Sequence, residues 1–157
     1  DCPQREQNGW TGDALMSVEQ TLMNFDAVSS YKKWLRDITD TQRPNGQICC
    51  IAPTGGWGYN WGSGPAWDSV LIHLPYYIYC YTGDLSAIKE FWENMRLYMK
   101  FMDSMSDDNF VCFGLGDWCA PKGSELCPTE LTDTAYFYIN NKIMARCAEL
   151  LGEDKSR

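Results

Sequence analysis

The segment Leu85 to Met102, LSAIKEFWENMRLYMKFM, repeats large apolar residues every three or four positions. Its apolar stripe consists of Leu85, Ile88, Trp92, Met95, Met99 and Met102. This spacing places the stripe on one side of a helix, where we interpret the methionines as ordinary core packing. The same period marks residues 15–25, 28–38, 67–81 and 135–150. Only 47–51 and 110–113 are short strand candidates, so the sequence predicts an all-α chain of about five helices.

Helix-ending and helix-starting residues support this division. Gly83 suits the end of the third helix and Asp84 the cap of the fourth. Thr132 or Asp133 is the expected start of the fifth helix. Pro75 lies inside the third stripe, so it should kink that helix or mark its true start.

Short and long connections alternate along the chain. Long loops are expected from about 43 to 65 and from about 107 to 129, whereas the other connections are tight. Helical hairpins stacked in a ring give this alternation, with the long loops gathered at one end. Long loops in compact domains are usually functional. Five helices are few to bury so many apolar stripes, and both ends look cut, so we expect residues 1–157 to be part of a larger all-α toroid.

Composition excludes several function classes. The chain has 157 residues, a formal net charge of -8 and a sequence pI near 4.5, which disfavours nucleic acid as a partner. No apolar stretch is long enough to span a membrane. The eight cysteines form no CxxC pair and the one histidine, His73, is interpreted as structural, so no metal site is expected. Disulfides and free thiols remain equal alternatives, and the compartment stays open.

The aromatic residues are unusually placed. Several of the seven tryptophans lie in glycine-rich loops, including Trp57, Trp61 and Trp118. Loop tryptophans are poor core formers but good ligand platforms, because they offer a large rigid surface with little entropy to lose. The C–H faces of a sugar suit such surfaces.

The opening segment, DCPQREQNGWTGD from Asp1 to Asp13, gathers three carboxylates ahead of a helix. Glycosidic bond cleavage needs one carboxyl to protonate the leaving oxygen and a second to activate water or attack carbon. Asp1, Glu6 and Asp13 suit this chemistry. From spacing alone, a helix N-terminus rich in acids explains them as well, because the helix dipole favours negative charge there.

This opening segment resembles the signature of the bacterial α-L-rhamnosidases, glycoside hydrolase family 78. Further likeness covers nearly the whole chain, in residues 24–26, 31–37, 51–53, 56–58, 66–68, 116–118 and 134–137. The resemblance implies part of an (α/α)6 barrel of six helical hairpins. It also implies hydrolysis of terminal α-L-rhamnosides with inversion, no cofactor, and a rhamnose-containing oligosaccharide or glycoside as substrate.

The resemblance assigns roles residue by residue. Glu6 falls on the general acid, although counting from Asp1 in the longer form of the motif would place Gln7 there. Arg5 would hold the carboxylate group together. The remaining positions implied to bind substrate are Asp1, Asp13, Trp10, Trp67, Trp118 and Asp117, with Asp68 as a further candidate for hydroxyl contact.

The family's general base is a glutamate far downstream, and no glutamate of this chain lies in a matching motif. We therefore expect the 157-residue chain to be inactive alone and to need the remainder of its parent polypeptide. Two alternatives remain open at this stage. One is another (α/α)6 glycosidase with a different sugar, and the other is a non-catalytic carbohydrate-binding helical fragment.

Overall fold

The computed structural model describes residues 4–54, 56–61 and 63–153, and over these residues the chain is mostly helical. The helices are α1 (Thr11–Asn24), α2 (Val28–Asp40), α3 (Pro65–Asp68), α4 (Val70–Thr82), α5 (Ser86–Ser104) and α6 (Thr129–Leu151). Two short strands, β1 (Ser106–Asp107) and β2 (Phe110–Val111), form an antiparallel hairpin between α5 and α6. The predicted all-α architecture of helical hairpins is confirmed.

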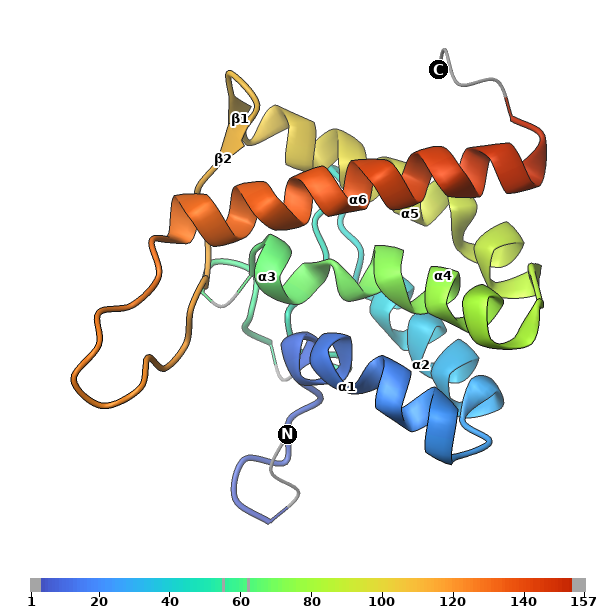
Figure 1. Ribbon diagram of the computed structural model, residues 1–157, viewed down its shortest axis with the longest axis horizontal. Coiled ribbons are helices and arrows are strands. Elements are labelled where there is room, and N and C mark those ends of the chain that lie inside the picture. The colour runs from blue at the N-terminus through green and yellow to red at the C-terminus, as the bar shows by residue number, and fades with distance from the viewer. Residues whose placement is uncertain (1–3, 55, 62, 154–157) are drawn as a thin grey trace.

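The helices form two layers around α4. Helix α4 contacts α1, α2, α5 and α6. Figure 1 shows α1, α4 and α6 across the front of the molecule, with α2 and α5 behind them. The tight turns that follow α1 and α4 lie at one end, and the two long loops lie at the other, as the alternation of connection lengths predicts. The long loops therefore share one end of the helical layers.

The core lies between the two layers. Leu35 of α2, Leu74 of α4 and Met95 of α5 are completely buried. Burying a side chain of this size stabilises the fold by roughly 1.5 to 3 kcal/mol relative to leaving it in water. Met95 and Met102 face this core, so the methionine stripe that defines α5 is ordinary packing.

The tight turn between α4 and α5 forms as its residue types predict. Gly83 adopts the left-handed conformation, with φ of 74°, and its amide donates to the carbonyl of Tyr79. Asp84 then accepts a 2.8 Å hydrogen bond from the backbone amide of Ser86, the first residue of α5. This bond satisfies one of the amides that a helix start leaves without a partner.

Two predicted helix boundaries need correction. The third predicted helix is interrupted at Ser69, which separates α3 from α4, and α4 runs on through Pro75. Helix α6 begins at Thr129, earlier than the predicted start at Thr132 or Asp133. Asp133 does not cap a helix, because its buried carboxylate bonds instead to the amide of Phe113 in the preceding loop.

Membrane-spanning helices, metal ligands and disulfides each bear on function. None of its helices is long and apolar enough to cross a membrane. Residues 4–54, 56–61 and 63–153 hold no group of three or more His, Cys, Asp or Glu side chains placed to bind a metal ion. The cysteines within these ranges are free thiols, namely Cys49, Cys50, Cys80, Cys112, Cys119, Cys127 and Cys147.

Candidate active site

The backbone of Gly9–Thr11 pairs with the backbone of Cys50–Ala52 in the first long loop. The amide of Ala52 donates to the carbonyl of Gly9, and the amide of Thr11 donates to the carbonyl of Cys50, each at 2.9 Å. The hydroxyl of Thr11 adds a 3.0 Å bond to the same carbonyl. These contacts fix the start of α1 against the first long loop, and Trp10 lies between them.

The glycines of the opening motif permit two close approaches. A Cβ atom at Gly9 would lie 2.3 Å from the carbonyl oxygen of Ala52. A Cβ atom at Gly12 would lie 2.8 Å from Nε1 of Trp67. Gly9 thus brings the motif onto the loop, and Gly12 allows the indole of Trp67 to lie directly against α1.

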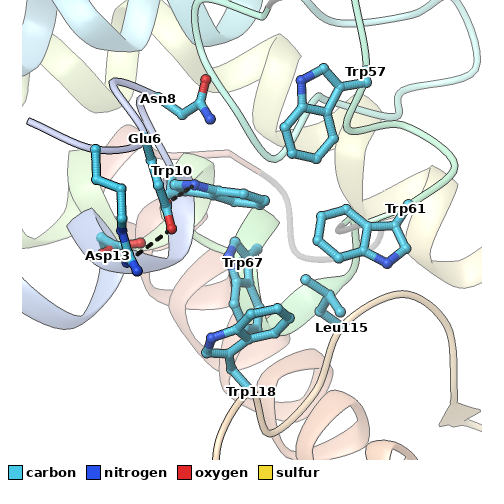
Figure 2. A pocket seen from close by; sticks show the side chains of 10 residues that line it. Glu6, Asn8, Trp10, Asp13, Trp57, Trp61, Trp67, Leu115 and Trp118 are labelled. Atoms are coloured by element: carbon cyan, nitrogen blue, oxygen red, sulfur yellow. Dashed lines mark hydrogen bonds and ion pairs between the residues drawn. The ribbon is translucent and has the colours of Figure 1, made fainter. Parts of the chain in front are cut away.

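One cavity opens at the loop end of the molecule, with a volume of about 550 Å³. This volume falls within the range of small-molecule sites in proteins. Figure 2 shows its lining, in which acidic and aromatic side chains from four separate parts of the chain converge. The cavity is lined by Arg5, Glu6, Asn8, Trp10, Asp13, Trp57, Trp61, Trp67, Leu115 and Trp118.

Glu6 is held by two donors at the edge of this cavity. The indole Nε1 of Trp10 donates to Oε2 of Glu6 at 3.0 Å, and Nη2 of Arg5 donates to Oε1 at 3.2 Å. The Glu6 side chain is still 41% exposed, so a ligand in the cavity can reach it. The pair of donors fixes the orientation of the carboxyl without burying it.

The aromatic wall of the cavity is a cluster of indoles in mutual contact. The rings of Trp57 and Trp61 stack with centroids 5.4 Å apart, and each meets Trp10 edge to face at 5.5 and 6.0 Å. Trp118, from the second long loop, meets Trp61 edge to face at 6.2 Å. Such contacts stabilise aromatic pairs beyond simple burial, so the wall is preformed.

The whole chain is similar to one known family. The family model of the bacterial alpha-L-rhamnosidase 6 hairpin glycosidase domain matches residues 1–157. The chain belongs to this family. An alpha-L-rhamnosidase of Formosa agariphila is 30% identical over 166 residues, which cover 96% of this chain and 17% of that relative. An alpha-L-rhamnosidase of Streptomyces avermitilis is 29% identical over 157 residues, or 98% of this chain and 15% of that relative.

Solved structures of the family share this fold. The α-L-rhamnosidase from Dictyoglumus thermophilum superimposes with a TM-score of 0.88 at 38% identity, covering 97% of this chain and 17% of that one. The Streptomyces avermitilis α-L-rhamnosidase, solved in complex with L-rhamnose, gives 0.87 at 26% identity over 95% of this chain and 14% of that one. The present chain therefore spans less than a fifth of the length of these family members.

Most site residues expected from the family resemblance lie together in the structure. The cavity joins Arg5, Glu6, Trp10, Asp13, Trp67 and Trp118. Asp1 lies outside the described residues. Asp117 does not line the cavity, and its carboxylate oxygens accept the amides of Cys119 at 3.3 Å and Cys127 at 2.9 Å. Asp117 thus closes the second long loop on itself, and its contact with a sugar stays a prediction.

The expected hydroxyl contact of Asp68 is not met. This carboxyl is completely buried, and its Oδ2 accepts hydrogen bonds from the Ser63 hydroxyl at 2.7 Å and the Gly64 amide at 2.9 Å. Burial raises the pKa of Asp68 to about 8, although both hydrogen bonds act in the opposite direction. Asp68 is thus bonded to the first long loop and does not line the cavity.

Sequence reasoning did not assign Trp57, Trp61, Asn8 and Leu115 to the cavity. The glycine-rich setting of the loop tryptophans indicated a ligand platform, and that signal could have identified Trp57 and Trp61 as site residues. Asn8 and Leu115 carry no comparable signal, because their positions depend on how the opening segment and the second long loop each meet the first long loop. His73 lies away from the cavity, with its Nε2 3.0 Å from Oδ1 of Asn140. Burial lowers the pKa of His73 to about 4, so this imidazole is neutral near pH 7.

Proposed function

We propose that this chain forms the general-acid half of an α-L-rhamnosidase active site, with Glu6 as the acid. The observation that carries the proposal is the Glu6 carboxyl, oriented by Trp10 and Arg5 at the edge of a tryptophan-walled cavity. Membership of a family whose curated relatives are named alpha-L-rhamnosidases supports the reaction. The substrate we propose is a terminal α-L-rhamnoside of an oligosaccharide or glycoside.

The lining of the cavity and one relative support this sugar class. L-Rhamnose has both hydroxyl groups and an apolar face with a methyl group, and it therefore needs acceptors and aromatic surface together. Asp13 supplies an acceptor, whereas Trp67 and Trp118 supply aromatic surface. The Streptomyces avermitilis relative was solved with L-rhamnose bound, which supports the same sugar here.

In the proposed reaction, the protonated Glu6 carboxyl donates its proton to the glycosidic oxygen as the bond from that oxygen to the anomeric carbon breaks. Water adds to the anomeric carbon from the opposite face, and a carboxylate base accepts a proton from that water, so the configuration inverts. In inverting glycosidases the two carboxyls stand roughly 6.5 to 9.5 Å apart to admit the water. We propose that the base comes from the remainder of the polypeptide.

The exposed apolar face of α6 supports a role for that remainder. Leu131, Tyr138 and Ile139 are 63%, 62% and 42% exposed, and Leu131 and Tyr138 line a hollow of about 600 Å³ with Phe110. Apolar side chains gathered in this way mark surfaces that pack against another element. We propose that residues 1–157 are part of a larger (α/α)6 domain, whose further hairpins cover this face.

Aryl glycosides test the proposed function in the full-length polypeptide that contains this chain. Hydrolysis of an aryl α-L-rhamnoside is expected, with little turnover of aryl α-L-arabinosides or glucosides. Preference for one of those sugars would instead support another (α/α)6 glycosidase. Binding of L-rhamnose without any hydrolysis would support a non-catalytic carbohydrate-binding protein.

The isolated 157-residue chain is expected to show no detectable hydrolysis, because we propose that the base comes from the remainder of the polypeptide. Measurable turnover by the purified chain, abolished by Glu6→Gln, would contradict the division of the site between two parts of the polypeptide. The same assay with full-length polypeptide in a parallel sample provides the positive control.

A further inference from the structure

The two long loops cross each other beside the cavity at Ser63–Gly64 and Gly114–Leu115. The amide of Leu115 donates to the carbonyl of Ser63 at 3.1 Å. A Cβ atom at Gly114 would lie only 1.3 Å from that carbonyl oxygen, and one at Gly64 would lie 2.5 Å from the carbonyl oxygen of Phe113. The backbones of the two loops are therefore in direct contact, with no room for a side chain between them.

A buried carboxyl holds the first loop at this crossing. Asp68, in α3, accepts hydrogen bonds from both Ser63 and Gly64 through its Oδ2 atom. The Ser63 residue that Asp68 holds is also the one whose carbonyl receives Leu115. Asp68 consequently acts on the second loop through the first.

A second buried carboxyl, on α6, holds the second long loop. Asp133, in α6, accepts the amide of Phe113 at 3.0 Å through its Oδ2 atom. Phe113 immediately precedes Gly114, so this bond and the Asp68 bonds fix the two sides of one crossing. Asp68 and Asp133 are both completely buried, and neither lines the cavity.

The crossing is close in sequence to the aromatic wall. Trp61 lies two positions before Ser63, and Trp118 lies four positions after Gly114. The rings of these two tryptophans meet edge to face at 6.2 Å, and Leu115 itself lines the cavity. Trp67 directly precedes Asp68 on α3. A shift at the crossing therefore moves aromatic surfaces from both loops.

We propose that Asp68 and Asp133 are positioning residues that clamp the loop crossing and thereby set the geometry of the aromatic wall for the sugar. The role in sugar binding rests on the proposed function, whereas the clamp itself does not. Each carboxyl acts through its Oδ2 atom as a hydrogen-bond acceptor, and Oδ1 of each has no hydrogen-bond partner among the described residues.

The surroundings of the clamp favour neutral acids. Burial raises the pKa of Asp68 to about 8 and that of Asp133 to about 7, and the charge of Asp133 adds to the shift at Asp68. Burial raises the pKa of the Tyr98 phenol, from α5, and the charges of the same two carboxyls add to that shift. A carboxamide can therefore replace Asp68, because its oxygen accepts the same two hydrogen bonds without a charge.

The test compares Asp68→Asn with Asp68→Ala in the full-length polypeptide. Hydrogen exchange of the Leu115 amide reports the crossing directly, since this amide is bonded to Ser63. Asp68→Ala should speed this exchange by about tenfold or more, because loop amides exchange through local opening. Asp68→Asn should stay within about threefold of the unchanged protein. Equal exchange in all three proteins would overturn the proposal.

Binding of L-rhamnose, measured by calorimetry, tests the consequence for the site. We expect Asp68→Ala to raise the Kd about tenfold or more and Asp68→Asn to keep it, since misplaced aromatic anchors lose affinity. Leu35→Ala, in the core of α2, is the control for a general loss of stability, and it should leave the Kd and the Leu115 exchange unchanged. A matching loss of affinity in Leu35→Ala would reduce Asp68 to a purely structural role and overturn the proposal.

A second variant tests the clamp if Asp68→Ala cannot be studied. If Asp68→Ala does not fold, Ser63→Ala removes one of the two donors to Asp68, and it should still speed the exchange of Leu115. Unchanged exchange in Ser63→Ala would then count against the clamp. If the unchanged protein shows no affinity for L-rhamnose, the proposed function fails, and the exchange experiment alone decides the clamp.

Discussion

At the scale of single residues, Trp10 makes two kinds of contact in the site. Its indole N–H orients the Glu6 carboxyl, and its ring supports the stacked pair of Trp57 and Trp61. The motif predicted that Glu6 and Trp10 share one site. It did not predict the hydrogen bond between them, which depends on the turn formed by residues 4–6.

Replacing Trp10 by phenylalanine keeps most of the ring and removes the donor to Glu6. Glu6 becomes a carboxylate as it gives up its proton, and the indole N–H then donates to a charged group. Such hydrogen bonds contribute roughly 1.5 to 3 kcal/mol, so we expect kcat to fall about tenfold to a hundredfold. The KM should change less, because an aromatic wall remains. Steady-state kinetics on an aryl α-L-rhamnoside measure both values. Trp57→Phe, which keeps a ring in the same wall, should leave kcat nearly unchanged, and an equal fall there would contradict the role of the N–H.

The buried carboxyl of Asp68 also predicts a dependence of stability on pH. Its pKa of about 8 lies above the ordinary value of 3.8, so the folded chain keeps a proton that the unfolded chain has released. Stability from this group is therefore complete below about pH 4 and is lost as the pH rises towards about 8. Asp68→Asn cannot titrate, so the fall in Tm between about pH 5 and pH 8 should become shallower in that variant. An unchanged slope in thermal unfolding would contradict a neutral Asp68.

At the scale of helices, the apolar spacing predicted the elements better than their ends. The α4–α5 turn was predicted correctly because Gly83 and Asp84 act within their own turn. The start of α6 was placed too late because Asp133 bonds to Phe113, a contact twenty positions away that local rules do not include. The break at Ser69 was missed as well, since Pro75 is the stronger local signal.

The packing of α1 on α3 depends on Gly12. Alanine is the better helix former by about 1 kcal/mol, yet its Cβ would lie 2.8 Å from the indole of Trp67. We expect Gly12→Ala to lower the free energy of unfolding by about 1 to 3 kcal/mol, because overpacking outweighs propensity. Urea unfolding measures the change. Gln20→Ala, at an exposed position of α1, should change it by less than about 0.5 kcal/mol. A gain in stability in Gly12→Ala would contradict this prediction, because it would mean that the indole of Trp67 moves aside at little cost.

At the scale of the whole molecule, the sequence predicted part of the cavity lining, and the structure shows how the rest of the lining joins it. Arg5, Glu6, Trp10 and Asp13 are close in the chain, so one motif was sufficient to predict them. The addition of Trp57, Trp61 and Leu115 depends on the loop crossing, where contacts join residues about fifty positions apart. No local pattern encodes such a contact.

The exposed apolar face of α6 gives a prediction for the full-length polypeptide. Leu131 is 63% exposed in this chain, so a substitution there would ordinarily change stability by less than about 0.5 kcal/mol. If further hairpins cover this face, Leu131→Ser should instead destabilise the full-length polypeptide by about 2 kcal/mol or more. Thermal or urea unfolding measures the difference. Lys100→Ser, at an exposed position of α5, serves as the control, and an equally small effect at both positions would contradict the covered face.

In the proposed reaction, Glu6 donates the proton to the leaving group. A missing general acid matters most when the leaving group is a poor one, because a good leaving group departs without a proton. The decisive measurement is kcat of Glu6→Gln in the full-length polypeptide, on α-L-rhamnosides of an acidic phenol and of an alcohol. Gln7→Ala is the matched control, since Gln7 is the other residue that the motif could align with the acid.

We predict that Glu6→Gln loses about a hundredfold or more in kcat on the alcohol glycoside, keeps most of its activity on the glycoside of the acidic phenol, and releases inverted sugar from both. Gln7→Ala should behave as the unchanged protein. An equal loss on both substrates in Glu6→Gln, or a leaving-group dependence that appears in Gln7→Ala instead, would contradict the assignment of Glu6 as the acid.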